Sequence, residues 1–225
     1  MNARVYVHNP YTAGTGNYET ISRISRYFGK QYCSNDCDIF VVLHARRSYE
    51  YVVAHPTRPY VLIVGGTDLN EDVYDSSLRW QVDYVLSQAS CVVVFMEYQR
   101  RQVLKTLPRA WVSVVPQGLE VTIPEKPREN IVEVLRGMKY YVWVGNRRSV
   151  KDPMYLQNEF EYMWKTYRVY LVYIGSGHER RDWNIVLGKL TRAEVFWVTM
   201  RSSGLINTSF SEGMCGAVME AMELG

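Results

Sequence analysis

The stretch "RVYVHNPYTAGTGNYETISRISRYFG", residues 4–29, decides the fold class. The short apolar run at 4–8 predicts a β-strand. Farther along, Ile21, Ile24 and Phe28 recur at spacings of three and four, which is typical of a helix. A strand, a glycine loop and a helix in this order indicate a parallel sheet covered by helices.

The same order recurs along the chain. Further apolar runs predict strands buried on both faces, and helical sequence follows each of them except the last. These runs lie at 38–44, 60–67, 90–96 and 111–118. A second set of strands and helices begins with "KYYVWVGN", 139–146. The sequence therefore predicts the α/β class, with two consecutive α/β domains.

The segment "VTIPEKPREN", residues 121–130, separates the two sets. Its two prolines among charged residues interrupt the rhythm, as an interdomain linker does. We therefore expect domains over 1–120 and 138–225, joined by a linker over 121–137. Because open α/β folds bind ligands beyond the carboxyl ends of their strands, we expect the functional site at those ends.

Composition excludes several classes of protein. The 225 residues carry a net charge of +3, and the basic residues are scattered in pairs, which argues against an extended nucleic-acid surface. No apolar run approaches the roughly 20 residues of a membrane span, and the N-terminus lacks the apolar core of a signal peptide. The four cysteines occur without a histidine cluster, so no metal site is expected. We expect a cytoplasmic protein without a membrane span, a nucleic-acid partner or a bound metal.

The closing segment "SFSEGMCGAVMEAMELG", residues 209–225, predicts a helix with Ser211 as its cap. The amides of Gly213 and Met214 would then lie in its first turn, where an anion is favoured. Small residues one turn before Glu220 would leave a slot for a nucleotide sugar. The Glu220 carboxylate could then accept hydrogen bonds from two ribose hydroxyls at once. The alternative is an amphipathic helix whose glutamates face water.

A basic loop follows the first strand of the second set. In "VGNRRSVKDP", residues 144–153, an arginine fork from Arg147 or Arg148 beside Lys151 suits a diphosphate. The alternative is a solvated basic loop. The loop "TAGTGN" after the first strand contains Gly16, which permits close approach of a ligand or simply forms a turn.

Two further features follow strands of the first set. His44 ends the predicted strand 38–44, where an imidazole could bond a substrate hydroxyl or relay a proton, or could be a buried structural histidine. In "VGGTDLNED", residues 64–72, the polar residues could bind hydroxyls or cap the next helix.

In chain order, these motifs resemble a known family. The glycine loop, "PQGLE" at 116–120, "VGNRRSVKDP" and "TSFSEGMCGAVMEAMELG" are similar to the retaining glycosyltransferases of family 4, which have two Rossmann-like domains (GT-B). The specific marker is the pair Glu212 and Glu220, separated by seven residues. The resemblance implies an acceptor-side first domain and a donor-binding second domain, with a nucleoside-diphosphate sugar as donor substrate and no cofactor.

The resemblance also implies roles for single residues. Arg148 and Lys151 would hold the donor diphosphate, and Glu220 the ribose hydroxyls. The transferred sugar would contact Glu212 and the amides that follow it, and His44 is similar to a histidine that faces the sugar. The complete expected set is catalytic Glu212 and His44, with donor-binding Gly16, Arg148, Lys151, Gly213, Met214 and Glu220.

This chain departs from the family pattern in three places. The family arginine lies five residues before its lysine, which falls on Asn146 here, so the choice between Arg147 and Arg148 stays open. The segment between "YIGSG", residues 173–177, and "NIVLG", residues 184–188, is too short for the helix that the family has there. The chain stops at Gly225, where the family continues with another strand.

The last departure leads to two expectations. The second domain is expected to be incomplete at its C-terminus, with an exposed sheet edge through which two copies could pair. One interpretation is a glycosyltransferase with an unknown acceptor. It would be inactive in this shortened form if the donor slot lacks support. The alternative is a non-catalytic nucleotide- or partner-binding protein that keeps the glycosyltransferase fold.

Overall fold

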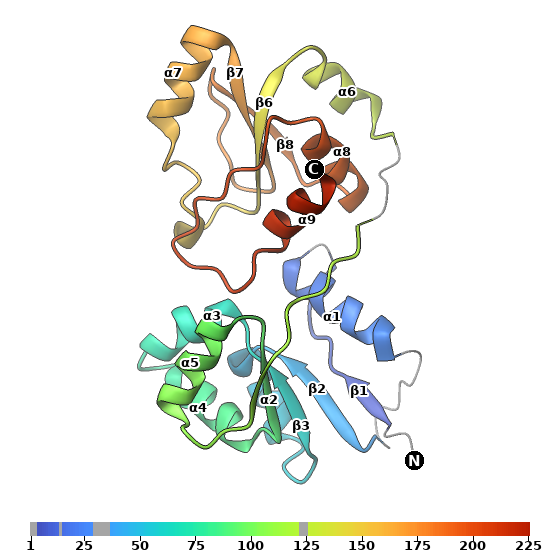
Figure 1. Cartoon of the computed structure of the whole chain (residues 1–225), viewed down its shortest axis with the longest axis vertical. Coiled ribbons are helices and arrows are strands. Elements are labelled where there is room, and N and C mark those ends of the chain that lie inside the picture. Colours follow the sequence, from blue (N-terminus) through green and yellow to red (C-terminus); the bar gives the residue numbers. More distant parts are fainter. Residues whose placement is uncertain (1–3, 14, 29–36, 122–125) are drawn as a thin grey trace. The chain divides into compact units, whose positions relative to one another are not determined.

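The computed structural model describes residues 4–13, 15–28, 37–121 and 126–225. They form two compact units (Figure 1). Unit 1 contains Met1–Gly118 and Glu212–Met214, and unit 2 contains Leu119–Ser211 and Cys215–Gly225. Both units contain an all-parallel sheet with helices on its faces, which confirms the predicted α/β class.

The described part of unit 1 contains a five-stranded sheet whose spatial order follows the chain. Its strands are β1 (Val5–Val7), β2 (Ile39–Leu43), β3 (Tyr60–Ile63), β4 (Cys91–Val94) and β5 (Val112–Val114). Its helices are α1 (Gly16–Phe28), α2 (Ala45–Val53), α3 (Gly66–Asn70), α4 (Arg79–Gln88) and α5 (Glu97–Thr106), with a 3₁₀ turn at Asp72–Tyr74. The predicted helix after the glycine loop is confirmed as α1.

Alternate residues of β2 face opposite layers, as the twofold repeat of a strand requires. Phe40 and Val42 join the core formed with α2, α4 and α5. Val41 and Leu43 face the other side, where Ile21 of α1 is fully buried. Both faces of the sheet are therefore apolar, which explains why its strands read as continuous apolar runs.

Unit 2 contains a three-stranded parallel sheet among the residues described. Its strands are β6 (Lys139–Val144), β7 (Val169–Ile174) and β8 (Asn184–Gly188). Its helices are α6 (Glu129–Leu135), α7 (Gln157–Tyr167), α8 (Arg192–Met200) and α9 (Gly216–Leu224), with a 3₁₀ turn at Ser149–Lys151. An isolated parallel bridge from Leu205 to Val142 extends the sheet beyond β6.

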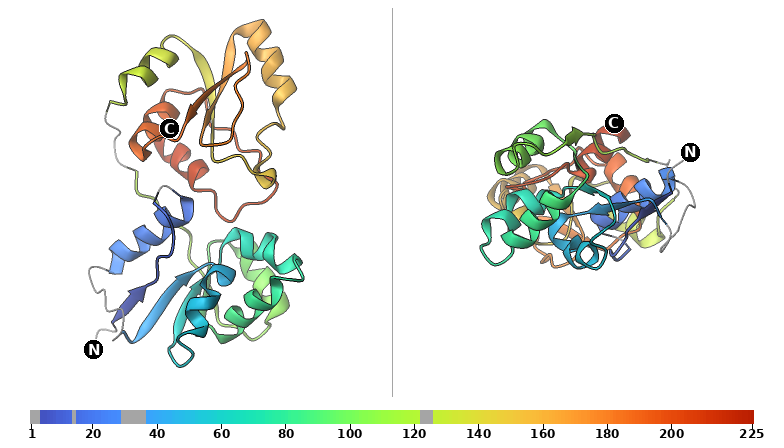
Figure 2. Two further views of the ribbon diagram at one scale, coloured as in Figure 1. Left: turned by 180° about the vertical axis from the view of Figure 1, so that it is seen from behind. Right: turned by 90° about the horizontal axis from the view of Figure 1, so that it is seen from below.

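Helices α6 and α8 pack on one face of this sheet, and α7 packs on the other (Figure 2). As predicted, the described chain between β7 and β8 has no helix. Trp183 from this connection packs instead beside Tyr173, on the α7 side of the sheet. Large aromatic side chains therefore fill space that a helix would otherwise cover.

The range predicted as a linker, 121–137, includes α6. Ile131 and Leu135 of this helix are buried in unit 2, and the division between the units follows Gly118. The domain boundaries given above stay predictions. None of the described helices is long and apolar enough to cross a bilayer.

Candidate functional site

The basic loop of unit 2 leaves the sheet directly after Val144, the last residue of β6. Arg147 is engaged within the protein: its Nη1 lies 2.8 Å from Oε1 of Glu179. Its hydrogen bond to Glu179 lowers the pKa of that carboxyl. Arg148 is exposed and forms no ion pair with any other residue the structure describes. Of the two arginines, Arg148 is therefore the one without a carboxylate partner in the part of the chain that the structure describes.

Lys151 is fixed by a segment far away in sequence. Thr208 donates its hydroxyl hydrogen to the Lys151 carbonyl over 2.8 Å and accepts one from the Trp143 indole over 3.0 Å. The amide of Phe210 donates to the carbonyl of Val150. Lys151 Nζ lies 5.9 Å from the ring centroid of buried Trp143, within cation–π range. These contacts define where the lysine emerges from the loop.

A glycine permits the close approach of two loops at this end of the sheet. Gly175 follows β7 with a φ of 135°, and a Cβ there would collide with the carbonyl of Gly145. His178 packs nearby, stacked on Tyr173 with ring centroids 4.6 Å apart, and its Nε2 lies 2.8 Å from the Gly145 oxygen. The loops after β6 and β7 are therefore packed against each other.

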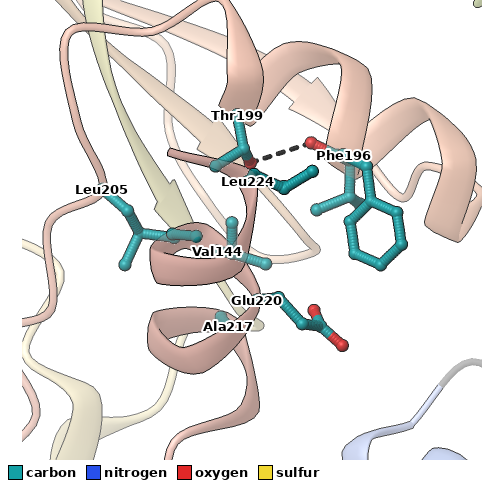
Figure 3. A pocket seen from close by; sticks show the side chains of 9 residues that line it. Val144, Phe196, Thr199, Leu205, Ala217, Glu220 and Leu224 are labelled. Carbon is teal, nitrogen blue, oxygen red and sulfur yellow. Dashed lines mark hydrogen bonds between the residues drawn. The ribbon is translucent and has the colours of Figure 1, made fainter. Parts of the chain in front are cut away.

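Glu220 lies on α9, and only 18% of its side chain is exposed. Arg192, the first residue of α8, places Nη2 2.8 Å from Oε1 of Glu220. Val144 and Glu220 line the same hollow (Figure 3). Apolar side chains, among them Val195 and Leu224, make up most of its lining. The hollow is therefore a packing seam, with the carboxylate turned away from Leu205 and Leu224 (Figure 3).

The position of Arg192 follows from the way α8 begins. Thr191 caps the helix by accepting from the amide of Glu194, whose carboxylate in turn accepts from the Thr191 amide over 2.9 Å. Arg128 adds a hydrogen bond of 2.6 Å to Glu194. This bond and those from Thr191 outweigh burial and lower the pKa of Glu194 to about 2.

The closing helix begins later than the sequence predicts. Its first residue is Gly216 and its N-cap is Cys215, so the prediction that Ser211 caps the helix is wrong. Glu212–Met214 group with unit 1 instead, where the sulfur of Met214 lies 3.3 Å from the Gln117 amide nitrogen. The amides of Gly213 and Met214 thus lie outside the first turn.

In unit 1, His44 lies directly after β2 and is 4% exposed. Its φ of 66° is unusual for a residue other than glycine. Nδ1 lies 3.2 Å from Oδ2 of Asp68. That carboxylate also accepts from the amides of Ala45, over 2.9 Å, and Gly65, over 3.0 Å. Burial would raise the pKa of Asp68, but His44 and these amides outweigh it and lower that pKa.

Gly65 is required by this arrangement, because a Cβ on it would overlap the imidazole ring of His44. Asp68 therefore caps and braces the turn, which is the capping alternative for "VGGTDLNED". Tyr11, which precedes the glycine loop, donates its hydroxyl hydrogen to the carbonyl of Leu43, and its ring centroid lies 6.5 Å from that of His44. Gly16 begins α1, and a Cβ there would meet no atom within 4 Å.

The predicted residues thus divide between the units. Unit 2 contains Arg148, Lys151 and Glu220, and unit 1 contains Gly16, His44, Glu212, Gly213 and Met214. Sequence reasoning missed Arg192 and Thr208 as partners of this set. The pattern Thr191–Glu194 predicts a helix start, but no local pattern indicates the contact with Glu220.

Comparisons with solved structures define the fold. HepE of Anabaena, in complex with UDP and glucose, matches with a TM-score of 0.65 at 13% identity, over 83% of this chain and 57% of that one. A TarM variant of S. aureus, solved with fondaparinux, alpha-GlcNAc-glycerol and UDP, matches with a TM-score of 0.61 at 15% identity, over 82% of this chain and 39% of that one. This chain therefore has the fold of GT-B glycosyltransferases, as predicted.

The chain is also similar in sequence to known proteins, one of which shows the extent of the match. This relative is glycosyltransferase 1 domain-containing protein 1 of Xenopus tropicalis, 31% identical over 189 residues, or 74% of this chain. The chain spans about half of that relative, 54% of its length. No family model matches the chain.

Proposed function

We propose that this chain supplies the donor site of a family 4 glycosyltransferase, which moves a sugar from a nucleoside-diphosphate sugar to an acceptor with retention of configuration. One observation carries the proposal. The loop with Arg148 and Lys151 starts directly after Val144, and Val144 lines the same hollow as Glu220. In the proposed site, the two cations of this loop and the carboxylate of Glu220 would bind one donor beyond the carboxyl end of β6, where parallel sheets bind ligands.

The diphosphate would bind the basic loop. Arg148 is the better candidate for the phosphate arginine, because Arg147 is paired with Glu179. A planar guanidinium binds phosphate oxygens in pairs, and Lys151 adds a point charge. Together they would stabilise the negative charge on the departing nucleoside diphosphate, which is the principal electrostatic demand of the reaction.

The nucleoside and sugar would use the remaining predicted residues. Glu220 would accept hydrogen bonds from two ribose hydroxyls. Glu212, with the amides of Gly213 and Met214, would bind the transferred sugar. His44 would face that sugar and Gly16 the donor phosphate. In this proposal the protein provides no nucleophile: it orients donor and acceptor on the same face, so the donor phosphate itself can take up the acceptor proton.

A transfer assay tests the proposal without knowledge of the acceptor. The whole chain is incubated with UDP-glucose, UDP-N-acetylglucosamine and GDP-mannose, with water as the only acceptor. Released nucleotide is measured, and the first anomer of the freed sugar is read by NMR. We expect slow release from one donor with the anomeric configuration retained, and loss of release in Lys151→Ala. An inverted first anomer would contradict retention.

Nucleotide binding without any release or transfer would favour the non-catalytic alternative. The same preparations should therefore be titrated with UDP and GDP. Binding without turnover would leave the donor site in place and remove the catalytic part of the proposal. If the chain neither binds nucleotide nor turns over a donor, the proposed donor site is wrong as well.

A further inference from the structure

Arg192 is held at the start of α8 by more than its own helix. The cap formed by Thr191 and Glu194 fixes the first turn. Four residues along, the buried ring of Phe196 lies 5.2 Å from the guanidinium carbon of Arg192. A cation over an aromatic face is stabilised, and residues four apart share a helix face. The guanidinium therefore lies over the Phe196 ring of its own helix in a defined orientation.

One nitrogen atom of Arg192 connects three segments of unit 2. Nη2 donates to Oε1 of Glu220 on α9 over 2.8 Å. It also donates to the backbone oxygen of Glu120 over 2.8 Å. With 27% of the arginine side chain and 18% of the glutamate side chain exposed, the pair is largely shielded from water. Such a pair is screened less than a surface ion pair and holds its geometry better.

This contact bears directly on the carboxylate that would bind ribose. A carboxylate has about four lone-pair positions, so a hydrogen bond from Arg192 on Oε1 is compatible with acceptance from ligand hydroxyls. Without the guanidinium, Glu220 would lose the hydrogen bond on Oε1, and its side chain would be held less firmly when a ligand binds. The arginine thus determines where the acceptor oxygens point.

We infer that Arg192 is a positioning residue that makes the site specific for nucleotides with an intact ribose diol over 2′-deoxynucleotides. The inference rests on the proposed function, because it takes Glu220 as the ribose acceptor. Arg192 contributes through the orientation of Glu220. Loss of Arg192 should therefore weaken binding only of ligands that have the hydroxyl pair.

The test compares a nucleotide with its 2′-deoxy form. The whole chain is titrated calorimetrically with UDP, GDP and ADP, and the tightest ligand is then compared with its 2′-deoxy counterpart. Arg192→Met removes the donors but keeps the side-chain stem that covers Phe196, so folding should be preserved. Arg201→Met is the matched control, because Arg201 lies at the other end of α8, 4.0 Å from the ring centroid of Trp197.

We expect the unaltered chain to prefer the ribonucleotide about tenfold, equivalent to about 1.4 kcal/mol, which is near the lower end of the contribution of a hydrogen bond to a charged group. Arg192→Met should reduce this preference to less than about twofold and leave the 2′-deoxy affinity within about threefold. Arg201→Met should leave the preference unchanged. In a Glu220→Gln background, Arg192→Met should cause no further loss of preference.

Three results would overturn the inference. In the first, Arg192→Met keeps the preference for the ribonucleotide unchanged. In the second, this variant loses affinity equally for the ribonucleotide and its 2′-deoxy form. In the third, the variant binds the ribonucleotide more tightly than the unaltered chain does. Each of these leaves the proposed donor site intact, because a nucleotide still binds the unaltered chain. If the unaltered chain binds none of the three diphosphates, the proposed function fails and the inference fails with it.

Discussion

Thr208 donates its hydroxyl hydrogen to the backbone carbonyl of Lys151 over 2.8 Å, although 57 residues separate them. The same oxygen accepts from the indole of buried Trp143. A side chain from the segment before α9 thus fixes the loop that follows β6. The position of the proposed phosphate lysine therefore depends on a part of the chain that no local sequence pattern connects to it.

The variant Thr208→Val should show how much the fixed position of Lys151 contributes to binding, apart from its positive charge. The substitution keeps the shape of the side chain but removes the hydroxyl that bonds both the Lys151 carbonyl and the Trp143 indole. The backbone at Lys151 is then no longer held in place, while the charge of the side chain remains. We expect affinity for the preferred nucleoside diphosphate to fall about five- to tenfold, with little change for the nucleoside, because only the phosphates contact the loop. Thr166→Val, on the exposed face of α7, is the control. Calorimetric titration of both ligands measures the difference.

Arg148→Ala and Arg147→Ala should differ sharply. Hydrogen bonds to charged groups contribute about 1.5–3 kcal/mol, so loss of Arg148 should weaken diphosphate binding about ten- to a hundredfold. Loss of Arg147 should change it less than about threefold, because that arginine is engaged by Glu179. The same titration checks both variants. A larger effect at Arg147 would reverse the assignment.

Asp68→Asn should destabilise unit 1 by about 1–3 kcal/mol at pH 7, because it weakens a buried acceptor of the backbone amides of Ala45 and Gly65. The pKa of Asp68 is lowered by folding, so its contribution is fully present above the ordinary carboxyl pKa of about 4. It is lost as the pH falls below that value. Urea unfolding at pH 7 and pH 3 should therefore show a smaller difference from the unaltered protein at pH 3. Glu50→Gln, on the exposed surface of α2, is the control.

Gly65→Ala and Gly16→Ala form a matched pair. The methyl group at position 65 would collide with the His44 ring, and overpacking of this kind costs about 1–3 kcal/mol. The methyl group at position 16 meets no atom within 4 Å, so thermal unfolding of that variant should be unchanged or slightly later. If Gly16 faces the donor phosphate as proposed, its variant should nevertheless lose donor affinity.

The layers of the fold could be predicted because they follow local patterns. The runs at 38–44 and 90–96 were predicted as strands, and β2 and β4 lie within them. The run at 60–67 was drawn too long, because Gly65 ends the extended segment and Gly66 begins α3. The bounds of such runs depend on contacts with residues far away in sequence, in this case the side-chain ring of His44 against Gly65.

The predicted site residues show the same limit. Arg148, Lys151 and Glu220 could be selected because their residue types suit phosphate and ribose. Their supporting partners could not, because Arg192 is 28 residues from Glu220 and the helix α9 begins five residues after the predicted cap Ser211. Only the folded chain brings such pairs together.

The most direct test of the account is calorimetric titration of the whole chain with UDP, GDP and ADP, beside Glu220→Ala and Glu223→Ala. Both glutamates lie on α9, but Glu223 is exposed. We predict that one diphosphate binds, that Glu220→Ala weakens this binding at least tenfold, and that Glu223→Ala leaves it unchanged. Equal affinities in all three proteins, or no binding by the folded chain, would contradict the claim that this chain contains a nucleotide-sugar donor site.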